Sequence, residues 1–93
     1  MLTLNATVNI PESVSFTMLD QQAVLLNLSN NHYYALDEVG ARLWGLLSEG
    51  KRLREIYQTL LDEYEVAPEQ LEQDILELLN DLMENGLVGI VQG

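Results

Sequence analysis

The chain has 93 residues, of which 47% are hydrophobic and 20% are charged, and its formal net charge at pH 7 is −11. This length and composition predict a single globular domain (residues 1–93) and exclude a disordered chain. The lack of cysteine excludes disulfides and thiolate metal sites, and the single histidine leaves little for imidazole chemistry. We therefore expect no metal and no cofactor.

The charge and the hydrophobic pattern also limit the partners. Such an acidic surface repels nucleic acid and anionic lipid. The longest apolar run, residues 87–91, is far too short to span a membrane, and no secretory signal opens the sequence. We expect a cytoplasmic protein without nucleic-acid or membrane partners.

The first 36 residues have the pattern of β-strands. Apolar and polar side chains alternate over residues 2–10, which predicts a half-buried strand that Pro11 ends within an N-terminal extension, residues 1–13. Runs at 14–19, 23–28 and 32–36 are separated by turn-forming residues. They predict an antiparallel meander of three strands over 14–36, or of four with the extension.

Residues 37–86 have helical spacing. Asp37 is placed to cap a helix from 38 to about 49, a strongly amphipathic helix follows over 53–64, and Pro68 opens a third helix that ends at 85. The tail, residues 87–93, either forms a short closing strand or packs on the core. Strands followed by three helices predict an α+β fold with helix-turn-helix character.

Few residues suit catalysis or nucleic-acid binding. The only imidazole, His32, lies in a predicted strand, and the paired carboxylates lie on solvated helix faces. The sequence has no glycine-rich phosphate loop and no metal-spaced cluster, so we expect no enzymatic activity. The third helix carries six acidic residues and no basic one, which opposes DNA reading by this helix.

Two features favour peptide binding. The apolar residues of the third helix cover an arc of about 160°, wider than the roughly 100° of one core-facing stripe. This helix either contacts a partner as well as its own core, or is buried on two sides by its own domain. The strand 32–36 has no charge and no proline to protect its edge, so it can accept an added strand.

Several segments, taken together, resemble the PqqD-like proteins in order and spacing over about residues 14–90. They are Val24–Asp37, Val39–Trp44 followed by Leu47, Val66–Glu69, Asp74–Leu76 and Leu82–Val88. Members of this family are recognition elements for the precursors of ribosomally made, modified peptides. A free-standing chain of this length looks most like the small B1 proteins of lasso-peptide pathways, or like PqqD itself.

The resemblance implies a winged helix-turn-helix-like domain that adds a leader peptide as a strand and lays it against the third helix. In a bacterial lasso pathway, the implied partners are a B2-type cysteine protease that removes the leader and an ATP-dependent cyclase. The predicted peptide-binding residues are Asn31, His32, Tyr33, Tyr34, Ala35 and Leu36 on the strand, and Leu71, Asp74, Ile75, Leu78 and Asp81 on the helix.

Three questions stay open at this point. Strand alternation points Tyr33 and Tyr34 to opposite faces, so only one of them faces the groove. The open edge also fits a homodimerising structural or adaptor domain. A third reading is a PqqD-type chaperone for a radical-SAM maturase.

Overall fold

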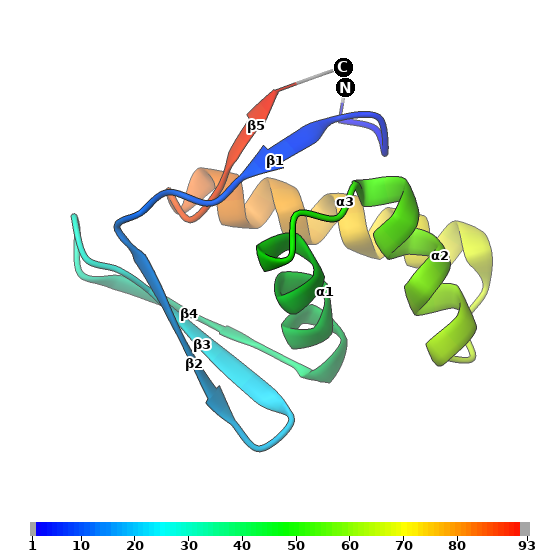
Figure 1. Ribbon diagram of the computed structural model, residues 1–93, viewed down its shortest axis with the longest axis horizontal. Helices are drawn as coiled ribbons and strands as arrows, with labels where there is room; N and C mark the ends of the chain where they lie inside the picture. The colour runs from blue at the N-terminus through cyan, green and yellow to red at the C-terminus, as the bar shows by residue number, and fades with distance from the viewer. Residues whose placement is uncertain (1, 92–93) are drawn as a thin grey trace.

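A computed structural model describes residues 2–91 of the chain. Its elements in chain order are β1 (Thr7–Asn9), β2 (Val14–Leu19), β3 (Gln22–Asn27), β4 (His32–Leu36), α1 (Glu38–Ser48), α2 (Leu53–Glu63), α3 (Pro68–Glu84) and β5 (Gly89–Val91). The strands β2, β3 and β4 form one antiparallel sheet in that order, while β1 pairs with β5. Figure 1 shows the helices between the three-stranded sheet and the β1–β5 ribbon. The predicted α+β fold is confirmed.

Two short connections build the three-stranded sheet. The residues Asp20–Gln21 join β2 to β3, and residues 28–31 join β3 to β4. Asp20 and Asn31 both have a φ of 59°, in the left-handed region that aspartate and asparagine tolerate better than most residues. The predicted meander over 14–36 therefore forms with turns close to the expected positions.

The N-terminal segment forms much less strand than its alternating pattern predicts. Only Thr7–Asn9 are paired, and Thr7 lies opposite Val91, where the described part of β5 ends. Leu4 and Ala6 are nevertheless buried, although the chain turns at residues 4–5. The prediction of one strand over residues 2–10 was wrong because the chain turns at residues 4–5 and buries Leu4 and Ala6 through that turn.

The tail after α3 takes both of the forms that the sequence left open, because Leu87 and Val88 pack in the core and Gly89–Val91 form the closing strand. Its strand β5 pairs with β1 in antiparallel register, with Val8 opposite Ile90. It does not reach the three-stranded sheet, in which β4 has β3 as its neighbour. Within residues 2–91 the outer edge of β4 is therefore left without a partner strand.

The helices end one residue before the predicted positions, at Ser48, Glu63 and Glu84. In each case the next residue is the C-cap, whose backbone N–H still donates to the preceding turn. The predicted N-cap of α1 is confirmed, because Asp37 Oδ1 accepts a hydrogen bond of 2.8 Å from the Gly40 N–H. Ala67 offers no such cap to α3.

The core lies between the inner face of the sheet and the three helices. Its largest fully buried side chains come from the sheet, from every helix and from the segment after α3: Leu25, Leu43, Leu53, Ile56, Leu60, Leu79, Leu82 and Leu87. Among residues 2–91, no helix combines the length and the apolar composition needed to cross a membrane.

One buried polar side chain, that of Asn27, links the sheet to the end of α3. Its Nδ2 donates to the Gly86 carbonyl at 2.9 Å, and its Oδ1 accepts from the Ser29 N–H at 2.9 Å. Both ends of the amide are thereby satisfied, so burial of this group carries little desolvation penalty. This link fixes the end of β3 relative to the carboxyl end of α3.

Candidate functional site

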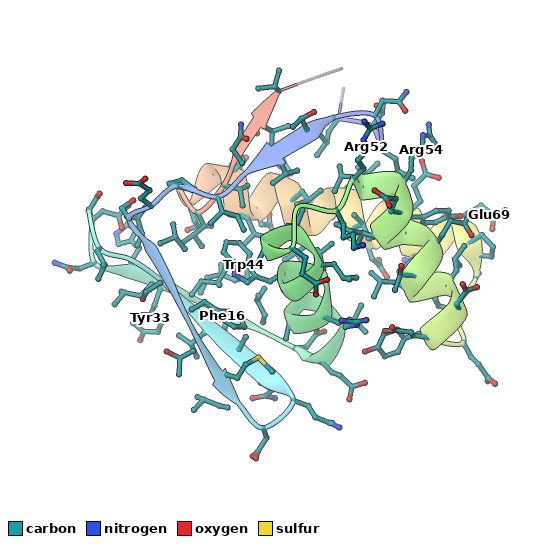
Figure 2. The ribbon with its side chains drawn as sticks, in the orientation of Figure 1. Phe16, Tyr33, Trp44, Arg52, Arg54 and Glu69 are labelled. Carbon is teal, nitrogen blue, oxygen red and sulfur yellow. The ribbon has the colours of Figure 1, made fainter. Side chains whose placement is uncertain are left out.

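The strand β4 presents an open edge whose side chains point alternately to the two faces of the sheet. Tyr34 lies opposite Leu25 and shares its inner face, whereas Tyr33 lies opposite Leu26 on the outer face. Tyr34 is half-buried, but Tyr33 is 76% exposed and lies at the margin of the sheet in Figure 2. Of the two tyrosines, Tyr34 is therefore the one that faces the helices.

A groove of about 600 Å³ begins at β4 and is closed on its far side by α3. Its lining from these two elements is Tyr34, Ala35 and Leu36 on the strand, and Leu71, Asp74, Ile75 and Leu78 on the helix. The volume is in the range of sites that bury a small ligand. A strand edge and a helix wall thus border one concave surface.

Seven of the eleven predicted peptide-binding residues line this groove. The other four lie around it: Asn31, His32 and Tyr33 are exposed along the same strand and its turn, and Asp81 follows Leu78 on α3 close to Tyr34. The structure gives their positions, and their role in peptide binding stays a prediction.

The floor of the groove comes from residues that the sequence analysis did not place in the site. They are Val39, Gly40 and Leu43 of α1, Leu60 of α2, and Tyr64 and Val66 after it. No local signal distinguishes these residues from other apolar helix positions. They belong to the site because the ends of α1 and α2 meet under β4.

The wide apolar arc of α3 divides among several environments. Leu71, Ile75, Leu79 and Leu82 are buried in the core. Leu78 is half-buried and lines the groove, while Leu76 is half-buried beside Leu2 in a separate shallow cleft. Met83 is 42% exposed and lines neither of these, so Leu78 is the member of the arc outside the core that borders the groove.

The rim of the groove is acidic. Asp37, Glu65 and Asp74 belong to its lining, which includes no basic residue. Gln70 Nε2 donates to Asp74 Oδ1 at 2.8 Å and fixes the orientation of that carboxylate. An apolar floor under an acidic rim suits a peptide that carries both apolar and cationic side chains.

The hydroxyl of Tyr34 remains neutral at physiological pH. Burial raises the pKa of Tyr34 above its ordinary value, and the negative charges of Asp81 and Asp37 raise it further. The phenol can therefore donate a hydrogen bond within the groove. Among residues 2–91, no group of three or more His, Asp and Glu side chains could hold a metal ion.

The link between Tyr34 and Asp81 can be tested by titration. We expect Asp81→Asn to lower the pKa of Tyr34, because a negative charge that disfavours the phenolate is removed. The ring resonances of Tyr34, followed by NMR from pH 8 to 12, measure this midpoint. Asp74→Asn is the matched control and should leave the titration midpoint of Tyr34 unchanged. An equal shift of that midpoint in both variants would contradict the placement of Asp81.

These features define a class of protein, a small α+β domain in which an open strand borders a groove walled by a helix. The chain belongs to the PqqD family, since the family model of coenzyme PQQ synthesis protein D (PqqD) matches residues 22–88. The resemblance found in the sequence is thereby confirmed. A comparison with curated proteins found no match.

Two solved structures are similar to this chain. The structure of TbiB1 in complex with the TbiA(beta) leader peptide has 38% identity and a TM-score of 0.82, and the match covers 86% of this chain and 93% of that chain. A lasso peptide synthetase B1 complexed with the leader peptide has 29% identity and a TM-score of 0.80, with 89% and 98% covered.

Proposed function

We propose that this chain binds the leader region of a ribosomally made precursor peptide in lasso-peptide biosynthesis, and that it does so without catalysis. The observation that carries the proposal is the uncharged edge of β4, which has no partner strand within residues 2–91, beside the groove of α3. The likeness to two B1 proteins solved with leader peptides supports the same function.

The leader adds to β4 as a further antiparallel or parallel strand. The five residues of β4 span about 16 Å at about 3.3 Å per residue, so about five leader residues pair with them. Backbone hydrogen bonds along this edge give affinity that depends little on sequence. Selectivity comes from the alternate leader side chains that enter the groove.

The groove selects a leader with apolar anchors and positive charge. Leu71, Ile75 and Leu78 offer apolar contact along one wall, and Asp74 offers a carboxylate on the same helix. The net charge of −11 attracts a lysine-rich leader before contact is made. A disordered leader loses entropy on ordering, so we expect a dissociation constant between nanomolar and micromolar.

The chain then presents the bound leader to processing enzymes in the bacterial cytoplasm. The partners are a B2-type cysteine protease, which removes the leader, and an ATP-dependent cyclase. Similarity to a lasso peptide synthetase B1 favours this pathway over service to a radical-SAM maturase.

An NMR titration of the isotope-labelled chain with its cognate leader tests the proposal. We expect saturable shifts of the backbone amides in residues 31–36 and 71–78. Leaders with a single N-methyl group provide the control. Methylation should weaken binding at positions whose N–H donates to β4 and should be tolerated at the intervening positions. The absence of shifts in both segments would refute this function.

The same open edge supports one alternative, a homodimer in which two copies pair their β4 strands. The charge of −11 on each copy opposes this association. Sedimentation at micromolar concentration separates the two functions. A dimer that persists with saturating leader would favour the alternative, whereas a monomer that binds the leader supports peptide recognition.

A further inference from the structure

The positive charge of this protein is concentrated in one place. The chain has four basic residues against fifteen acidic ones. Arg42 is neutralised by Glu63, because its Nη2 lies 2.8 Å from Oε2 and its Nε donates to Oε1 at 2.9 Å. The other three, Lys51, Arg52 and Arg54, are exposed at the turn before α2 and in its first turn.

These three cations border a cleft of about 890 Å³ between the α1–α2 turn and residues 4–8. Arg54 Nε donates to Asn5 Oδ1 at 2.8 Å, which holds the guanidinium against the N-terminal segment. Glu55 is the one acid of the lining, and its Oε1 already accepts the Arg52 backbone N–H at 3.2 Å. The cleft is therefore locally positive on a strongly negative molecule.

The walls between these charges are largely apolar. Leu4, Ala6 and Val8 line one side, and Leu47 and Leu53 line the other. Val8 is half-buried, whereas the other four belong to the core, so Val8 is the apolar side chain among them that a partner can cover. A bare inorganic anion would leave it uncovered. The combination suits a peptide segment in which carboxylates flank an apolar side chain.

The cleft is separate from the groove beside β4. The two share no lining residue and differ in the sign of their charge. Figure 2 shows Arg52 and Arg54 at the far side of the molecule from Tyr33. Both sites can therefore be occupied at the same time, which a presenting protein requires.

We propose that this cleft docks an acidic segment of a partner protein, with carboxylates on Lys51, Arg52 and Arg54 and an apolar side chain against the half-buried Val8. This inference rests on the proposed function, and under that function the partner is the protease that receives the leader-bound chain. Nucleic acid is a poor occupant, because the net charge and the acidic α3 repel its phosphates.

The test compares two triple variants with the same net charge. Lys51→Gln, Arg52→Gln and Arg54→Gln remove the cations of the cleft. Gln21→Glu, Gln58→Glu and Asn80→Asp add as much negative charge at exposed positions outside both sites. The probe is the purified leader-cleaving protease, titrated into each immobilised variant with and without leader at several salt concentrations.

We expect the cleft variant to bind the protease at least tenfold more weakly and with a smaller salt dependence. The affinity of the control variant for the protease should stay within about threefold of the wild-type value. The two variants should bind the leader with equal affinity, because they have the same net charge. Equal losses in the two variants, no loss in either, or a wild-type cleft that binds duplex DNA instead would overturn the inference.

If the proposed function is wrong, the result is different. The wild-type chain then fails to bind the leader, whether or not it binds the protease. Circular dichroism of both variants checks the fold, which substitutions at exposed positions should preserve.

Discussion

Leu78→Glu is expected to weaken leader binding at least tenfold while the fold survives. Leu78 is half-buried and lines the groove beside Ile75 and Asp74, so a carboxylate there replaces an apolar contact with a charge that the leader must desolvate. A tenfold loss corresponds to about 1.4 kcal/mol. Fluorescence anisotropy of a labelled leader measures the affinity, and thermal unfolding checks the fold.

Leu76→Glu is the matched control for this variant. Leu76 lies on the same helix and is also half-buried, but it lines the separate cleft beside Leu2. Both variants add one negative charge, so the general repulsion or attraction of a charged leader is equal in the two. We expect the control to bind within about threefold of the wild type. A folded Leu78→Glu protein with wild-type affinity would show that the groove is misplaced.

Leu79→Ala, one position further along α3, should lower the stability of the fold and leave the affinity for the leader unchanged. Leu79 is fully buried, and truncation of such a leucine costs about 2–5 kcal/mol through lost transfer energy and a residual cavity. That is a large part of the roughly 5–15 kcal/mol that stabilises a small domain. Denaturant unfolding should show the lower stability, while protein that remains folded at low temperature should bind the leader normally.

Leu28→Ala provides the comparison for the core. Leu28 is 59% exposed in the turn between β3 and β4, so its truncation should change the unfolding free energy by less than about 0.5 kcal/mol. Equal stability of the Leu79 and Leu28 variants would contradict the placement of the core. Adjacent residues of one helix thus separate binding from stability, because successive positions differ by about 100° around the helix axis.

The identities of most helices and strands follow from short-range signals. Asp37 starts α1 through a bond to Gly40, three residues away, and Asp20 and Asn31 form turns within a few residues of their own position. Such signals act between neighbours in the chain, so they are visible without knowledge of the fold. The segments between Val24 and Val88, taken together, also sufficed to identify the family.

The shape of the candidate site required the tertiary structure. Seven predicted residues do line the groove, but its floor includes Leu43 and Leu60, which look like any other buried helix residue in the sequence. The choice of Tyr34 over Tyr33 depends on register with β3, which alternation alone leaves undecided. The part that the seven groove residues play in leader binding remains a prediction, which the NMR titration tests.

The sequence by itself determined the helices, the meander and the absence of charge on the strand 32–36. Tertiary structure decided that the closing strand β5 pairs with β1 and leaves β4 open, and that Lys51, Arg52 and Arg54 meet residues 4–8 across a cleft. The physical reason is that strand partners and clefts arise from contacts between segments far apart in the chain, which local propensity does not specify.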